Sequence, residues 1–333
     1  MERTFGSRIN IFFLKIFLLF LFTTLTAFVC LLIGTIDISI SELFKILFGK
    51  ESASGLSQII LEIRLPRILL AIAVGGGLSV AGAVFQSILL NPLAEPYILG
   101  ISSGGTFGAV LAMLLGLSFW IVQISAFSGA IIVVFLVFVL GRRFGEIEPN
   151  VLLLSGVMVG AFFAAVILLM VTMLGESLRT AVLWLIGNLS TAKKDSVYIV
   201  LPLSIIFSFI LSINGQKFNV LSLGTETAQH LGIDTKFVKN FAYIISSLLI
   251  GSIVSVSGII GFVGLIVPHS CRMIFGSDNK IVIPASFFIG ASYLVIADTI
   301  ARTIISPSEI PVGAVTAIIG APVFVYLLRK RWS

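Results

Sequence analysis

The sequence predicts an all-α integral membrane protein with about ten transmembrane helices. Of its 333 residues, 58% are hydrophobic and only 11% are charged, whereas about 25% of the residues of a soluble domain carry charge. Uncharged runs such as residues 68–94 and 96–141 are long enough to cross a bilayer, which takes roughly 20 apolar residues. Lysine and arginine gather between such runs in the cytoplasmic loops of membrane proteins. The net charge of +6 therefore reflects topology, and we expect no nucleic-acid partner.

The first helix is expected at residues 11–34. Basic residues precede it, and they place the N-terminus in the cytoplasm. The uncharged stretch 16–36 is longer than the core of a signal peptide and shows no small-residue cleavage pattern, so we interpret it as a retained helix. Residues 37–62 follow outside, where Ser39-Ile40-Ser41-Glu42-Leu43 is typical of a helix cap and a short interfacial helix.

Helices 2 to 5 are expected within residues 67–174. The second helix carries Ala73, Gly77 and Ala81 at four-residue steps, which make a flat face where another helix backbone can approach closely. The two prolines of Asn91–Pro96 cannot continue a regular helix. We therefore expect a rigid turn there, followed by helix 3.

We hypothesise that the second half of the chain repeats this organisation in the opposite sense. Trp184-Leu185-Ile186-Gly187 is expected to form a short re-entrant or interfacial helix, and helix 6 follows at 196–213. A polar cytoplasmic segment is expected at 214–240, and helices 7 to 10 within 241–328. Helices 2–5 start outside and helices 7–10 start inside, which is compatible with the inverted repeat of many transporters. All 333 residues would form one transmembrane domain.

Ordered motifs extend from about Arg64 to the C-terminus. In this order and at this spacing the chain resembles the permease subunits of ABC importers for iron–siderophore complexes, haem and cobalamin. The motifs are Arg64-Leu65-Pro66-Arg67; Asn91–Pro96 with Leu99-Gly100; Leu154-Ser155-Gly156-Val157; Trp184–Gly187; Leu223–Ala228 with Leu231-Gly232; Gly261–His269 with Arg272; Asp298 with Ala301-Arg302; Ile310-Pro311-Val312-Gly313; and Gly320-Ala321-Pro322.

The resemblance implies a multi-pass permease of a prokaryotic cytoplasmic membrane, with both termini in the cytoplasm and no cofactor of its own. It would pair with a second copy or a close paralogue, with two ATP-binding subunits inside and one solute-binding protein outside. The cargo would be a bulky iron chelate, haem or cobalamin, and selectivity would rest mainly with the binding protein.

The residues themselves exclude an ATPase site in this chain. Gly49-Lys50 is its only Gly-Lys pair, and it lacks the earlier glycine and the following hydroxyl of a phosphate-binding loop. Two other classes stay open. An ion-coupled secondary transporter needs buried ionisable groups, and a membrane enzyme needs clustered histidines or carboxylates. The chain offers few of either, and we expect no catalytic residue.

Three arginines, Arg64, Arg67 and Arg302, are expected at the outer ends of helices 2 and 9. The resemblance implies that they pair with carboxylates of the solute-binding protein and fix its orientation. The alternative is that they are interfacial anchors whose stems lie in the bilayer. Asp298 is an acid within an apolar helix, which is a functional candidate. A pair with Arg302, one turn later, is the simpler expectation.

The inner segment 222–234 is expected to hold a short helix lying along the membrane surface. By resemblance it enters a groove on the ATP-binding subunit and transmits its closure, and the alternative is a solvated loop. The expected contact residues are Gly224, Glu226, Thr227, Ala228, His230, Leu231 and Gly232.

Helices 5 and 10 are the pathway walls by resemblance, with Pro149 and Asn150 at the inner constriction. Small residues remove bulk along both helices, although helix packing is the alternative explanation. These residues are Gly156, Gly160, Gly313, Ala317 and Gly320.

His269, Cys30 and Cys271 are the remaining residues with metal-ligating chemistry. No second ligand lies near His269 at metal spacing, so a structural histidine is expected rather than a metal or haem ligand. The two cysteines lie far apart in apolar runs, where buried thiols are expected rather than a disulfide. We therefore predict no metal site.

Overall fold

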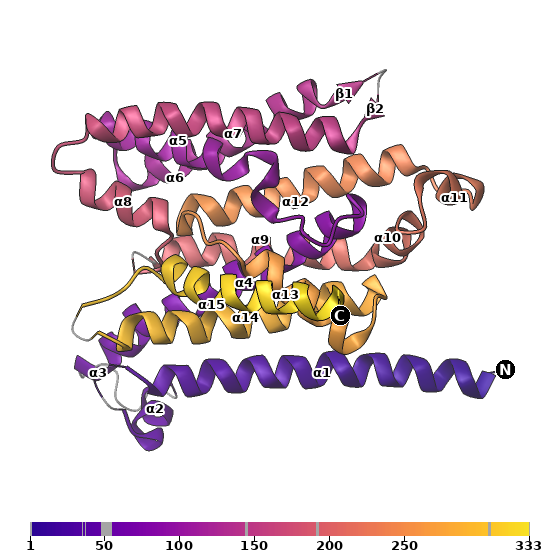
Figure 1. The fold of residues 1–333 in the computed structure, drawn as a ribbon. Coiled ribbons are helices and arrows are strands. Elements are labelled where there is room, and N and C mark those ends of the chain that lie inside the picture. Colours follow the sequence, from indigo (N-terminus) through magenta and orange to yellow (C-terminus); the bar gives the residue numbers. More distant parts are fainter. Residues whose placement is uncertain are drawn as a thin grey trace.

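The computed structural model describes residues 2–34, 36, 38–47, 55–143, 146–190, 193–305 and 308–332. Within them the protein is helical apart from one short antiparallel hairpin, β1 (Arg142–Arg143) and β2 (Glu146–Ile147). The long helices run side by side across the molecule (Figure 1). The short helix α3 lies at one end of this bundle, and α11 lies at the other end, which is also the end where α1 starts.

The described residues contain ten apolar helical stretches. Seven are long enough to cross a membrane, and three are shorter. The prediction of an all-α membrane protein is confirmed. The long stretches are residues Ile11–Leu32 of α1 (Glu2–Leu32), the continuous run of α3 (Gly55–Gln58), η1 (Ile59–Arg64) and α4 (Leu65–Ile88), α6 (Phe119–Leu140), α7 (Pro149–Thr172), α9 (Lys194–Ile213), α12 (Thr235–Ser257) and α14 (Asn279–Thr303). The shorter ones are α5 (Ile101–Leu114), α13 (Val263–Phe275) and residues Val312–Leu327 of α15 (Val312–Trp332).

Five short helices complete the fold. They are α2 (Ile40–Leu47), η2 (Pro96–Leu99), α8 (Leu178–Ile186), α10 (Gly215–Leu221) and α11 (Thr225–His230). The predicted cap of α2 is present, because the Glu42 amide donates to Ser39 Oγ at 3.3 Å and the Ser39 amide donates to Glu42 Oε2 at 2.8 Å. This reciprocal pair satisfies two amides that a helix start leaves open. The bonds from Ser39 lower the pKa of the Glu42 carboxyl.

Helix α4 is the centre of the bundle, and nearly all of its residues are buried. The small face predicted there is confirmed. A Cβ on Gly77 would overlap side chains of α9 and α12, and the Ala73 carbonyl accepts a hydrogen bond from Ser204 Oγ of α9 at 2.7 Å. On another face, Gly75 approaches the backbone of α14 so closely that a Cβ would overlap the Gly290 carbonyl. Small residues thus let α4 contact its neighbours at backbone distance.

Two helix interruptions meet inside the bundle. One is the proline turn between α4 and α5, and the other is the turn between α12 and α13. Glu95 Oε1 accepts from the Phe262 amide at 3.1 Å, and the Tyr97 hydroxyl accepts from the Ile260 amide at 3.1 Å. These bonds satisfy amides that the broken helices leave open. The two turns occupy matching places in the two predicted repeats, and the inverted repeat itself stays a prediction.

Helix α12 begins at Thr235, earlier than the start expected at residue 241. The reason is a cap that favours the earlier start: Asp234 accepts a hydrogen bond from the Phe237 amide at 2.9 Å. The polar inner segment therefore consists of α10, α11 and their connections.

Candidate functional site

Arg67 is the centre of a buried ion-pair network at the end of the bundle opposite α11. Its Nε donates to both carboxylate oxygens of Asp298 on α14, at 3.0 and 2.9 Å, and its Nη1 donates to Glu309 Oε2 at 2.7 Å. The Arg67 and Asp298 side chains are 5% and 2% exposed, whereas Glu309 is 44% exposed. Two charge-assisted contacts thus tie α4 to α14 and to the segment before α15.

The hydrogen bond expected between Asp298 and Arg302 is not formed. Arg302 Nη2 donates instead to the Cys30 carbonyl at 2.7 Å and to Thr299 Oγ1 at 3.3 Å. Asp298 is still close enough to attract Arg302 electrostatically. Asp298 and Arg302 lie one helical turn apart, as predicted, but Arg67 of the neighbouring helix α4 donates to both oxygens of the Asp298 carboxylate.

Arg64 closes the end of α1. Its guanidinium donates to the carbonyls of Leu31, Leu32 and Ile36, at 2.9, 3.3 and 2.7 Å. The last carbonyls of a helix have no partner within it, and a cation there is favourable. Arg64, Arg67 and Arg302 are only 4%, 4% and 7% exposed. Their visible contacts are therefore internal, neither bilayer anchors nor a charged outer surface, and their docking role stays a prediction.

The inner segment forms a compact arm at the other end of the bundle (Figure 1). Gly224 and Gly232, on either side of α11, have φ values of +106° and +80°, which glycine adopts with little strain. Lys239 Nζ donates to Thr225 Oγ1 at 2.9 Å, and Gln229 Nε2 donates to Thr235 Oγ1 at 3.2 Å. Both bonds fix α11 against α12.

The arm exposes most of the residues expected to contact an ATP-binding subunit. Glu226, Thr227, His230 and Gly232 are exposed, and Leu231 is 61% exposed. Ala228 is the exception, because it is fully buried and packs α11 onto the bundle. The structure thus removes Ala228 from the surface available for contact and gives it a packing role.

The small residues of α7 and α15 mostly serve helix packing. A Cβ on Gly156 would overlap the Ile98 carbonyl, and one on Gly313 would overlap the Ile186 carbonyl. A Cβ on Gly320 would overlap the Phe262 side chain. These three glycines therefore contact their own chain, as the packing explanation predicts.

The remaining pathway candidates are more accessible. The nearest atom to a Cβ on Gly160 would be Ser103 Oγ at an ordinary 3.9 Å, while Ala317 and Pro149 are half-buried and Asn150 is exposed. Their pathway role stays a prediction. The outward faces of α7 and α15 are apolar, with Leu154, Met158, Phe162, Leu168 and Leu169 on α7 and Ile318, Val325 and Tyr326 on α15 exposed by 59–73%.

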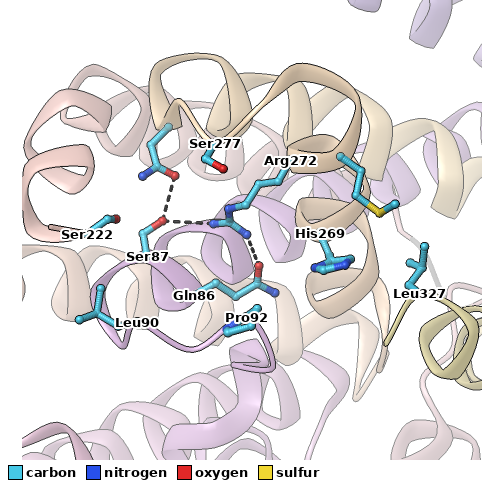
Figure 2. A pocket seen from close by; sticks show the side chains of 11 residues that line it. Gln86, Ser87, Leu90, Pro92, Ser222, His269, Arg272, Ser277 and Leu327 are labelled. Atoms are coloured by element: carbon cyan, nitrogen blue, oxygen red, sulfur yellow. Dashed lines mark hydrogen bonds between the residues drawn. The ribbon is translucent and has the colours of Figure 1, made fainter. Parts of the chain in front are cut away.

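A pocket of about 670 Å³ opens at the same end as the arm. This pocket was not predicted from the sequence. Figure 2 shows Arg272 and His269 of α13 facing Gln86 and Ser87 at the end of α4. Arg272 Nη1 donates to Gln86 Oε1, and its Nη2 donates to the Ala83 carbonyl at 3.0 Å and to Ser87 Oγ at 3.2 Å. An arginine three residues after His269 in an apolar helix was the available signal.

Metal chemistry finds no support in the described part of the chain. It contains no group of three or more His, Cys, Asp or Glu side chains that could hold an ion. Cys30 and Cys271 are buried free thiols, and His269 is 9% exposed at the pocket wall. These positions fit the structural roles expected for all three residues.

Comparison with known proteins places the chain in a family. Residues 19–330 match the FecCD transport family. The chain belongs to that family. It is 42% identical over 270 residues to the cobalamin import system permease protein BtuC of Halobacterium salinarum, covering 81% of this chain and 73% of that protein. It is 36% identical over 321 residues to the iron(3+)-hydroxamate import system permease protein FhuG of Bacillus subtilis, covering 93% and 95%.

A solved structure shares the fold. It shows an inward-facing conformation of a metal-chelate type ABC transporter, with a TM-score of 0.86 and 32% identity over 95% of this chain and 99% of that chain. This FecCD protein is therefore a multi-pass membrane permease of an ABC importer, not itself an enzyme, and the family carries no cofactor. An ABC importer permease works with an ATP-binding protein and a binding protein.

Proposed function

We propose that this FecCD permease carries an iron–siderophore chelate, haem or cobalamin inward across the cytoplasmic membrane of a prokaryote, with both termini in the cytoplasm. The observation that carries the proposal is the arm of α10 and α11. It is exposed, held by side-chain hydrogen bonds, and belongs to a chain without a phosphate-binding loop. The cobalamin and iron-hydroxamate permeases among its relatives support the substrate class.

The assembly we propose contains two permease copies, or one copy with a close paralogue, two ATP-binding subunits and one solute-binding protein. The exposed apolar faces of α7 and α15 support a second copy. The two helices lie apart in the bundle (Figure 1), and most of their exposed side chains are apolar. A second copy would bring these faces together, and the rest of the apolar surface would contact lipid.

The binding protein would dock on the end opposite the arm. Arg64, Arg67 and Arg302 would support that surface from beneath, because in this conformation they are bonded inside the chain. Glu309 is the exposed member of the network. A docked binding protein would contact Glu309 and so act on the buried arginines. Closure of the ATP-binding subunits would move α11, and α12 would transmit the movement because α11 is bonded to it.

Reconstitution tests this function. The permease is placed in liposomes with its ATP-binding and solute-binding partner proteins, and uptake of labelled ferric hydroxamate, haem and cobalamin is measured. We expect uptake of one of them that requires internal ATP and persists when ionophores collapse ion gradients. Uphill uptake by the permease alone on an ion gradient would instead establish the secondary-transporter alternative.

A further inference from the structure

The polar side chains that line the pocket at the inner end of the bundle come from several separate parts of the chain. Gln86 and Ser87 come from the end of α4, Arg272 from α13, Asn279 from the start of α14, and Ser222 from the connection between α10 and α11. Its volume of about 670 Å³ lies in the range of small-molecule sites, roughly 300–1,000 Å³. It therefore has room for a ligand and borders the arm directly.

Arg272 brings a positive charge into this pocket, and no carboxylate of the described residues is bonded to it. Its three hydrogen bonds all go to neutral oxygens, those of Gln86, Ala83 and Ser87. A guanidinium has five N–H groups, so two remain after these three bonds. A desolvated charge that lacks an opposite charge is unfavourable, and an anion entering the pocket would remove that cost.

The nearest acid in the sequence does not supply the missing charge. Asp278 caps the start of α14, where its Oδ1 accepts from Asn219 Nδ2 at 2.7 Å and from the Lys280 amide at 3.0 Å. It does not line the pocket. Ser277, which does line it, carries an exposed hydroxyl. The pocket therefore combines one arginine cation with neutral polar and apolar side chains.

We propose that this pocket binds an oxyanion, a carboxylate or phosphate group, on the Arg272 guanidinium. The Nε–H group and one Nη1–H group of Arg272 are not used in its bonds within the chain, and charge-assisted hydrogen bonds from a guanidinium to such groups are strong. The bound oxyanion would connect the ends of α4 and α13 to the residues that precede α11. Its presence would thus stiffen the base of the arm that we expect the ATP-binding subunit to contact.

The oxyanion has two sources that the same chemistry would accept. It is either a free phosphate-bearing or carboxylate-bearing metabolite from the cytoplasm, or an acidic side chain of the ATP-binding subunit inserted beside α11. The site itself is independent of the proposed cargo, because its charge and donors belong to this chain alone.

Titration with inorganic phosphate tests the site on the whole permease. The protein is held in nanodiscs of uncharged lipid, and phosphate binding is measured by calorimetry at constant ionic strength. We expect saturable binding that Arg272→Gln weakens by roughly tenfold or more, since hydrogen bonds to charged groups are the strong ones. Ser277→Asp is expected to weaken it as well, because it places a carboxylate in the pocket while keeping Arg272 and its bonds.

Lys280→Gln is the matched control. Lys280 is an exposed cation on the same turn of chain that does not line this pocket, so its loss should leave phosphate affinity unchanged. If Arg272→Gln impairs folding, the Ser277→Asp variant still tests the proposal. Equal phosphate affinity in Arg272→Gln, Ser277→Asp and the natural protein would place the binding elsewhere.

A second measurement separates the two sources. Affinity of the ATP-binding subunit is measured with and without phosphate, for the natural permease and both pocket variants. If phosphate competes with the ATP-binding subunit, and the subunit binds both variants more weakly than the natural permease, the oxyanion is an acidic side chain of the subunit. Phosphate binding without any effect on partner affinity identifies a free anion. The proposal is overturned if neither phosphate binding nor partner affinity responds to Arg272→Gln and Ser277→Asp.

Discussion

Two buried arginines at opposite ends of the bundle, Arg67 and Arg272, have different kinds of partner. At the outer end, Arg67 is bonded to two carboxylates, one of them almost fully buried. At the inner end, Arg272 is bonded only to neutral oxygens and faces a pocket. Arg67 therefore has its counter-charges within the chain, whereas Arg272 is bonded to no carboxylate among the described residues.

This difference separates an internal structural contact from a site that a ligand can complete. Removing one partner of a buried ion pair leaves an unbalanced charge and is strongly destabilising. Removing a cation that has no acid partner leaves no such charge. The four predictions below measure how far the two ends differ.

The largest effect is expected for Asp298→Ala. The substitution leaves Arg67 buried without its main counter-charge, which costs about 3–5 kcal/mol of the free energy of unfolding. Unfolding of the purified protein in mixed detergent, followed by circular dichroism, measures this loss. The double variant Arg67→Met with Asp298→Leu should recover most of it, because apolar replacements of a buried pair are often neutral. An Asp298→Ala protein as stable as the parent would show that the outer network is not structural.

The next effect concerns the arm, and it compares an exposed residue with a buried one. Leu231→Glu should keep the fold but weaken association with the ATP-binding subunit by roughly tenfold, the size of one strong interface contact. Ala228→Glu should instead lower the stability of the permease, since it forces a charge into a fully buried position. Co-purification and thermal unfolding of both variants distinguish these outcomes. Unchanged association of Leu231→Glu would remove this face of α11 from the interface.

The sequence was sufficient for the features that depend on local pattern. Hydrophobic runs predicted the spanning helices, the four-residue spacing of Ala73, Gly77 and Ala81 predicted a packing face, and Ser39 with Glu42 predicted a helix cap. Each of these depends on residues near one another in the chain. The ordered motifs predicted the family, which the match over residues 19–330 confirms.

The features that the sequence could not provide depend on contacts between distant segments. Asp298 and Arg302 are one turn apart, but Arg67, far earlier in the chain, reaches the carboxylate. The pocket around Arg272 likewise requires the ends of α4 and α13 to meet. Burial of Ala228 in an otherwise exposed arm also follows from packing, which a short polar segment does not reveal.

A smaller effect is expected for Arg272→Gln on stability. It removes three hydrogen bonds to neutral acceptors. The Ala83 carbonyl keeps a partner, because Ser87 Oγ donates to it at 2.9 Å. The net loss should be about 1 kcal/mol, well below that of Asp298→Ala in the same unfolding assay. An equal loss would mean that both ends hold structural arginines, and the contrast between them would fail.

The smallest effect is expected for Glu309→Gln at the outer end. Glu309 contacts the same guanidinium as Asp298, at 2.7 Å, but its side chain is 44% exposed. Water already screens an exposed pair, so its loss should cost no more than about 1 kcal/mol and should shrink further in high salt. Unfolding of Glu309→Gln at low and high salt, beside Asp298→Ala, measures both points. If Glu309→Gln matched Asp298→Ala, burial would not be what distinguishes the two carboxylates, and Glu309 would belong to the structural core of the network.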